Sequence, residues 1–199
     1  HVPAILDVWY PGSQGGAAVA NLLVGDAVPG GKLPFTWPRT VGQVPMFYAH
    51  MVSHEPDNQG RRYWDEESTP LFPFGHGLSY ATFSYGDLVL GSTSVGLEDT
   101  VSVSVDVTST GDRDAEEVVQ LYLHQRHGRA SRPVRELKGF ERVAIGAGQT
   151  RTVTFEVTPD HRRYWNAAER GWVLDPSTFD VWVGTSSTAE ATATFEVTA

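Results

Sequence analysis

Adjoining acidic side chains are the first candidates for chemistry in this sequence of 199 residues. They occur at Asp65, Glu66 and Glu67, and again at Glu116 and Glu117. Acid–base cleavage of a glycosidic bond needs two carboxylates that face each other across one sugar, roughly 5–10 Å apart. Because neighbouring residues of a strand point to opposite faces, neither run makes such a pair, and we expect both to be solvated.

The residues that lead into Asp65 are suited to holding a sugar. The segment reads Gly60-Arg61-Arg62-Tyr63-Trp64. Its aromatic rings can cover a sugar face, and its arginine and carboxylate groups can bind hydroxyls. We therefore take Tyr63, Trp64 and Asp65 as candidate substrate-binding residues, with a structural role for this segment as the alternative.

Other catalytic patterns are absent. The turn around Ser13 has Pro11 where a nucleophile elbow has glycine, and it lacks the Gly-Lys-Ser/Thr of a phosphate loop. A helix that begins there could still bind an anion, but a glycine turn that packs a helix against a strand is favoured.

The histidines show no metal-ligand spacing, and the chain has no cysteine. This applies to His50, His54 and His76 in one loop-rich stretch and to His124 and His127 near a strand end. The sequence therefore predicts neither a metal nor a cofactor.

The first 79 residues predict one strand–loop–helix–strand unit and a long loop. Ala4 to Tyr10 is a near-continuous apolar run, typical of a buried strand of a parallel sheet. Ala17 to Leu23 has helical spacing, with Gly25 as its C-cap, and Leu33 to Trp37 predicts a short strand. Such a unit would expose sheet edges and the apolar face of its helix, so we expect its partner strands to come from other polypeptide.

Residues 80–199 predict an antiparallel β-sandwich without a helix. Valines alternate with polar residues from Val101 to Thr108, a period of two with one buried face. Further strands are expected over 118–123, 134–145, 153–157, 179–183 and 192–197. Short strands separated by polar turns are typical of immunoglobulin-like and fibronectin-like sandwiches.

Composition limits the partners. A formal net charge of −9 argues against nucleic acid and against anionic membrane surfaces. No apolar run reaches the roughly 20 residues of a spanning helix. The opening at His1, followed by an apolar run, suggests the middle of a longer protein, and nothing in the sequence fixes its compartment as cytoplasmic or secreted.

Taken in order, several motifs resemble the C-terminal part of glycoside hydrolase family 3, the β-glucosidase and β-xylosidase family. The most specific is Phe72-Pro73-Phe74-Gly75-His76-Gly77-Leu78-Ser79-Tyr80. The others are Trp9-Tyr10-Pro11-Gly12, the segment from Leu23 to Pro34, Tyr63-Trp64-Asp65, Gln120-Leu121-Tyr122, and Arg135-Glu136-Leu137-Lys138-Gly139-Phe140.

The resemblance implies the end of an α/β sandwich domain with its linker over residues 1–80 and a fibronectin type III-like domain over residues 81–199. It also implies a retaining mechanism, with an aspartate nucleophile on an upstream (β/α)8 barrel and a glutamate acid/base in the α/β sandwich domain. No carboxylate of this chain matches either, so we assign no catalytic residue. Trp9, the loop from His50 to Asp65 and the loop from Gln125 to Arg132 are expected to form the rim of the substrate pocket.

Three functions follow as hypotheses. In the leading one, the chain supports the catalytic domains of an exo-acting β-glycosidase and shapes the pocket for a small β-glycoside. In the second, the sandwich is an independent carbohydrate-binding module with Trp165, Trp172 and Trp182 as a stacking platform. In the third, it mediates contacts of a homodimer.

Overall fold

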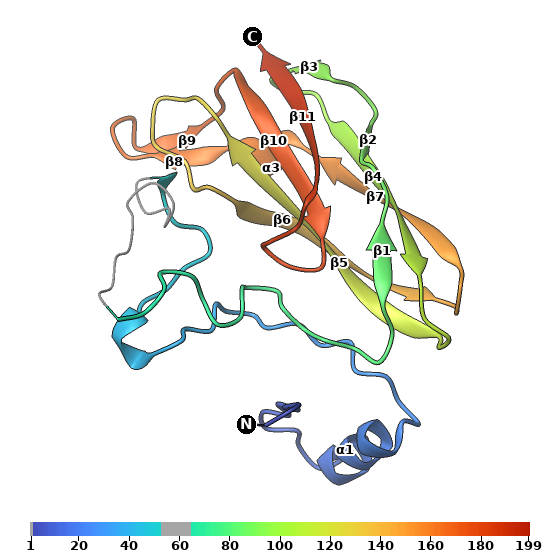
Figure 1. The fold of residues 1–199 in the computed structure, drawn as a ribbon. Coiled ribbons are helices and arrows are strands. Elements are labelled where there is room, and N and C mark those ends of the chain that lie inside the picture. The colour runs from blue at the N-terminus through green and yellow to red at the C-terminus, as the bar shows by residue number, and fades with distance from the viewer. Residues whose placement is uncertain (1, 53–64) are drawn as a thin grey trace.

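A computed structural model describes residues 2–52 and 65–199 of the chain. A β-sandwich forms the upper part of Figure 1, and the N-terminal segment and a single longer helix lie below it. The residues between α1 (Gly15–Val24) and β1 (Phe83–Tyr85), described over 26–52 and 65–82, form a linker that runs between the two along the sandwich. No helix in the described ranges is long and apolar enough to cross a membrane.

The N-terminal helix forms as predicted. It is α1 (Gly15–Val24), and it ends at Gly25, whose φ of 84° is left-handed and whose N–H donates to the carbonyl of Leu22. Glycine adopts this conformation without steric penalty, which explains the stop. A single 3-10 turn, η1 (Val41–Gln43), follows in the linker.

The predicted strand over residues 4–10 is wrong for this chain, because the described residues 2–10 are exposed and form no strand. A strand needs hydrogen-bonded neighbours, and no described segment pairs with it. The predicted strand over 33–37 is reduced to one antiparallel bridge, Trp37 with Phe72, supported by Leu33 N–H donating to the His76 carbonyl at 2.8 Å.

The sandwich prediction is confirmed. In one sheet the central strand β4 pairs with three others; the members are β1 (Phe83–Tyr85), β2 (Val89–Leu90), β4 (Val101–Ser109) and β7 (Thr150–Val157). The second sheet has the order β3 (Ser94–Gly96), β11 (Ala191–Thr198), β10 (Ser177–Gly184), β5 (Ala115–Gln125) and β6 (Glu136–Ile145). Only the β3–β11 pairing is parallel among these ladders.

The core lies between the two sheets. Strand β4 contributes every second residue, from Val101 to Val107, while Ser102 and Asp106 face outward. From the other sheet, Phe179 and Phe195 stack at 5.4 Å where β10 and β11 pair. The alternation therefore fixes which face of each strand is buried.

Two small elements complete the fold and differ from the sequence prediction. A four-residue helix, α3 (Pro159–Arg162), interrupts the expected all-strand region and begins at a Thr158–His161 capping box. It leads into a hairpin of β8 (Tyr164–Asn166) and β9 (Gly171–Val173), in which Trp165 and Trp172 face outward opposite each other. The third tryptophan of the predicted platform, Trp182, lies on β10 under the guanidinium of Arg135.

Candidate functional site

The predicted site residues do not come together in the described part of the chain. Trp9 is 57% exposed, with a φ of 47°, and its N–H donates to Asp7 Oδ1 at 3.0 Å. Asp65 is exposed in the linker. Tyr63 and Trp64 lie outside the described residues, so their placement stays a prediction.

Trp9 begins a row of aromatic rings that leads into the most specific sequence motif. Its ring packs edge-on against Phe35 at 5.8 Å, and Phe35 lies 5.3 Å from Trp37. Trp37 contacts Phe72 at 6.4 Å, and Phe72 stacks on the ring of His76 at 5.0 Å. Edge-to-face and stacked pairs at these separations are favourable, so the row fixes the linker relative to Trp9.

The two predicted rim loops meet where the structure describes them. Met51 forms a bridge with Pro133, and Val134 N–H donates to the His50 carbonyl at 2.9 Å. Met51 and Val52 then line one hollow of about 430 Å³ together with residues 124–128 and 130–132. The structure therefore brings the first part of the His50–Asp65 loop and the Gln125–Arg132 loop to one edge of the sandwich.

The linker covers the outer face of β5. Gln120 and Tyr122 point away from the sandwich core, yet they are only 3% and 0% exposed. The Tyr122 ring meets Tyr48 of the linker at 5.9 Å, and Tyr48 stacks on Phe74 at 4.3 Å. We call this contact between the linker and β5 the junction; it makes the linker and the sandwich one packed unit.

A buried ion pair closes the other end of the junction. Lys32 Nζ lies 3.1 Å from Glu117 Oε1, and the side chains are 12% and 3% exposed. Tyr85 also donates its hydroxyl to Glu117, at 3.0 Å. The expectation that Glu116 and Glu117 are both solvated is therefore wrong for Glu117, because position 117 shares the inward face of β5 with Val119 and Leu121. Glu116, on the opposite face, pairs with exposed Arg142 as expected of a surface residue.

Glycine is required where the linker crosses β5. Gly75 has a φ of 79°, and a Cβ there would lie 2.2 Å from Gln120 Oε1. Gln120 is held in place because its Nε2 donates to the carbonyls of Gly75 and Thr185, at 3.2 and 2.6 Å. The close approach explains a glycine inside the aromatic motif.

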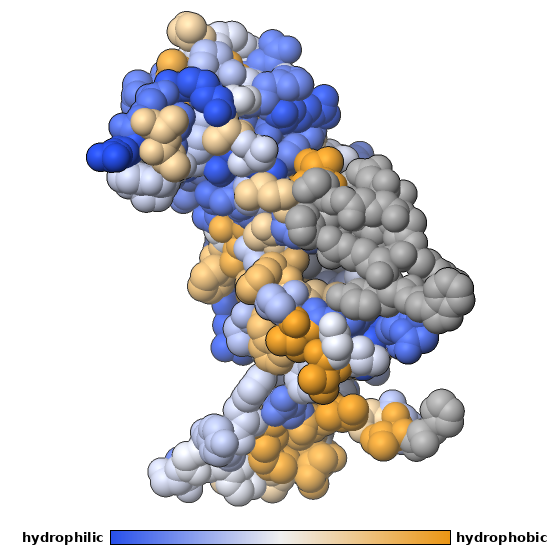
Figure 2. Space-filling model, turned by 90° about the vertical axis from the view of Figure 1, so that its left-hand side faces the viewer, coloured by the Kyte–Doolittle hydropathy of each residue, from blue (hydrophilic) through white to orange (hydrophobic). Residues whose placement is uncertain are grey.

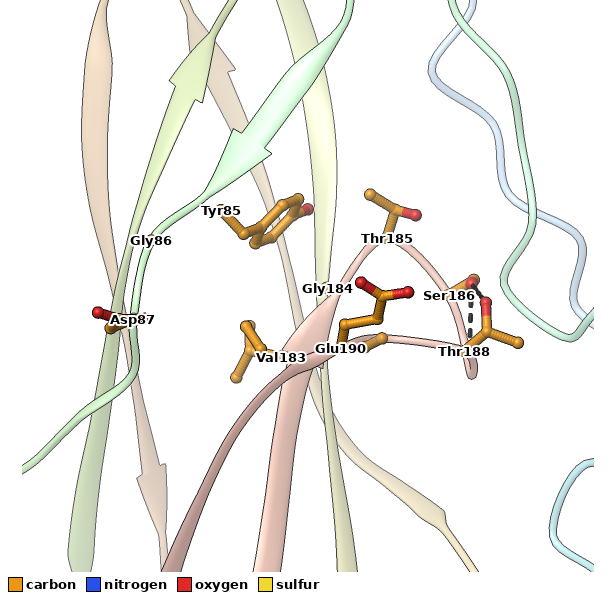
Figure 3. Close-up of a pocket in the computed structure, with 11 residues that line it drawn as sticks. Tyr85, Gly86, Asp87, Val183, Gly184, Thr185, Ser186, Thr188 and Glu190 are labelled. Carbon is orange, nitrogen blue, oxygen red and sulfur yellow. Dashed lines mark hydrogen bonds between the residues drawn. The ribbon is translucent and has the colours of Figure 1, made fainter.

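A hollow of about 510 Å³ lies beside the junction, between β1 and the β10–β11 loop. Figure 3 shows the Glu190 carboxylate directed toward Tyr85 and Thr185. The Tyr85 hydroxyl already donates to Glu117, and Ser186 and Thr188 bind each other at 2.9 Å. Three of its polar side chains, those of Tyr85, Ser186 and Thr188, are thus committed to bonds within the protein.

Two largely buried carboxylates near the rim, Asp175 and Asp180, are kept ionised. Burial alone would raise the pKa of Asp180, but hydrogen bonds from Arg126 and Thr194 outweigh it and lower that pKa. The pKa of Asp175 is also lowered, because hydrogen bonds from Tyr164 and Arg129 outweigh the effect of its burial. Neither is suited to act as a general acid. Within the described ranges, no cluster of three or more histidine and acidic residues could hold a metal.

His76 gives the junction a dependence on pH. Burial, and then the charge of Lys32, lower the pKa of His76 below its ordinary value of 6.5. The unfolded chain therefore binds more protons at His76 than the folded chain does. The stability that neutral His76 contributes is complete above pH 6.5, the ordinary pKa, and is lost as the pH falls below that value. We expect the urea midpoint to fall from about pH 8 to about pH 5, and to fall less in His76→Gln. An equal fall in the variant, in parallel denaturation curves, would contradict this role.

The N-terminal part presents an exposed apolar surface. In Figure 2, apolar surface is concentrated in the lower part of the molecule, below the sandwich. The large exposed apolar residues of this part are Val2, Ile5, Leu6, Val8, Trp9, Tyr10, Leu23 and Val24. Exposed apolar surface of this kind marks a site of interaction.

Comparison with known proteins identifies both parts of the chain. Residues 1–80 match the glycosyl hydrolase family 3 C-terminal domain, and residues 117–187 match a fibronectin type III-like domain. A periplasmic β-glucosidase of Salmonella typhimurium is 40% identical over 98% of the chain, and a β-xylosidase of Formosa agariphila is 42% identical over 100%. The chain spans about a quarter of their length, 26% and 27%.

The fold agrees with solved structures of such enzymes. A β-glucosidase of Listeria innocua in complex with glucose superposes with a TM-score of 0.90 at 36% identity, over 97% of this chain and 28% of that one. A β-glucosidase of Erythrobacter marinus gives 0.91 at 40% identity, over 98% and 25%. The chain therefore belongs to glycoside hydrolase family 3, of which it carries the C-terminal portion.

Proposed function

We propose that this chain is the C-terminal part of a retaining, exo-acting β-glucosidase that hydrolyses terminal β-linked sugars. The names of the relatives support the reaction class, since they are β-glucosidases and β-xylosidases. The aspartate nucleophile and the glutamate acid/base are proposed to lie in the barrel and α/β portions of the same enzyme. The chain itself supports those domains and shapes the edge of their pocket.

The observation that carries this role is the apolar surface over residues 2–10 and α1. Covering such side chains is worth roughly 25 cal/mol for each Å² removed from water, so this surface favours a tightly packed partner. The partner we propose is the remainder of the α/β domain. Its strands would flank residues 4–10 and supply the hydrogen-bonded neighbours that this segment needs to form a strand.

The junction explains how the sandwich can contribute to a pocket at a distance. The Lys32–Glu117 pair and the Tyr48–Phe74–Tyr122 contacts fix the linker to the sandwich. The aromatic row from Trp9 to His76 fixes the linker to the N-terminal part. Trp9 and the rim loops, with Asp65, are thus proposed to be presented by one framework.

Turnover of an aryl β-glucoside tests this function. We expect residues 1–199 alone to be inactive, because both catalytic carboxylates are proposed to lie upstream of this chain. The longer enzyme, with its upstream domains, is expected to release the aryl alcohol with retention of the anomeric configuration, followed by NMR. Measurable turnover by residues 1–199 alone would contradict the proposal, as would inversion by the longer enzyme.

A further inference from the structure

The β8–β9 hairpin carries an aromatic pair that the fold does not need for its core. Trp165 and Trp172 face each other across the hairpin and are 53% and 63% exposed. Their ring centroids are 5.9 Å apart, and the ring planes meet at 79°. Their strand neighbours Tyr164 and Asn166 are buried instead, so those residues supply the packing on the inner face.

Polar contacts hold this hairpin firmly to the sandwich. Tyr164 donates its hydroxyl to Asp175, and Arg129 Nε donates to the same carboxylate at 2.6 Å. In the connecting turn, Asn166 Oδ1 accepts the N–H groups of Ala168 and Glu169 at 3.0 and 3.3 Å. A binding surface built on such an element is ordered in advance, which reduces the entropy lost on binding.

The pair is too small for a stable protein interface. A tryptophan side chain presents at most about 250 Å², so the exposed parts of both come to about 300 Å². A stable protein contact buries about 800 Å² on each partner. The area suits one or two rings of a small, flat, partly apolar ligand.

We propose that Trp165 and Trp172 bind sugar residues of a β-linked glycan. The C–H face of a pyranose is apolar and packs on an aromatic ring, while its hydroxyls need donors at the edge. Arg170 can supply donors there, since it is exposed and directly precedes β9. The chain's net charge of −9 disfavours an anionic polymer and is indifferent to a neutral glycan.

The ring geometry narrows the ligand further. Rings that meet at 79° form a corner and not a plane. A corner admits the end or edge of a flexible soluble chain, whereas a flat crystalline surface needs coplanar rings. The hairpin is thus expected to bind soluble oligosaccharides and not crystalline cellulose. The choice of β-linked glucans and xylans as ligands rests on the proposed function. The stacking of a sugar on the two tryptophan rings does not depend on that function.

Titration of residues 1–199 with cellohexaose and xylohexaose tests the site, with intrinsic tryptophan fluorescence and calorimetry as readouts. We expect saturable binding that weakens at least about tenfold in Trp165→Ala and in Trp172→Ala, which corresponds to about 1.4 kcal/mol each. Phe140→Ala is the matched control, because Phe140 on β6 is also an exposed aromatic residue, at 69%. Near-ultraviolet circular dichroism checks that the variants remain folded.

Several outcomes would overturn the proposal: no saturable binding by the native chain, unchanged affinity in the double variant, or an equal loss in Phe140→Ala. A sedimentation shift from dimer to monomer in the double variant, without any loss of sugar binding, would assign the pair to self-association instead. Turnover of a small aryl glucoside by the longer enzyme should not change in the double variant. Failure of the hairpin site is therefore distinguishable from failure of the proposed function.

Discussion

Lys32→Met is expected to lower the free energy of unfolding by about 3–5 kcal/mol, because it leaves the carboxylate of Glu117 buried without its cation. Lys32 Nζ lies 3.1 Å from Glu117 Oε1, and in the variant Glu117 would keep the Tyr85 hydroxyl as a side-chain donor. Methionine keeps the length and apolar stem of lysine, so little packing is lost. Urea denaturation of residues 1–199 measures the change.

Two controls make this prediction specific. Adding Glu117→Gln to Lys32→Met removes both charges, and the amide can still accept the Tyr85 hydroxyl, so most of the lost stability should return. Arg142→Met removes the cation beside Glu116, whose pair is 2.9 Å long but more than half exposed on both sides. That change should stay below about 1 kcal/mol. Equal effects at Lys32 and Arg142 would show that burial of Glu117 is unimportant.

The sandwich could be predicted because alternation directly reports burial. Val101, Val103, Val105 and Val107 each face the core, as their spacing requires. The same reasoning could have located Glu117, which falls on the inward positions of β5. Treating it with Glu116 as one acidic run concealed that neighbouring residues of a strand have opposite environments.

Other features depend on segments that are distant in sequence. Gln120 and Tyr122 occupy outward positions of β5, and only the linker, some 45 residues earlier at Gly75, explains their burial. The composition of residues 4–10 predicts a strand, but a strand forms only where a neighbouring strand exchanges hydrogen bonds with it. The short strands of the β8–β9 hairpin, three residues each, are too brief for a periodic signal.

The candidate site shows the same division. The sequence favoured Trp9 for its motif, and the structure adds its contact with Phe35 and the row of rings beyond it. The sequence alone could not distinguish which of Trp165, Trp172 and Trp182 face solvent. Pairing across the hairpin exposes Trp165 and Trp172, whereas Trp182 is covered by the Arg135 guanidinium at 4.2 Å.

Gly75→Ala is expected to lower the free energy of unfolding by about 2–5 kcal/mol and to loosen the linker from β5. A left-handed φ of 79° costs an alanine about 1–2 kcal/mol. The new methyl group would also meet the Gln120 carboxamide, which cannot move away without losing its bonds to Thr185 and to the Tyr122 hydroxyl. Displacing that buried network adds about 1–3 kcal/mol. Urea denaturation and hydrogen exchange at residues 71–77 measure the two effects.

Gly148→Ala separates strain from packing in this prediction. Gly148 has a comparable φ of 67°, but no atom lies within 4 Å of the position that a Cβ would take. Its alanine variant should therefore lose only the conformational part, about 1–2 kcal/mol, without faster exchange in the linker. The difference between the two variants isolates the contact between Gly75 and Gln120. If Gly75→Ala lowers the free energy of unfolding no more than Gly148→Ala does, the contact between Gly75 and Gln120 does not fix the linker to β5. The sandwich could then not position the rim loops through this contact.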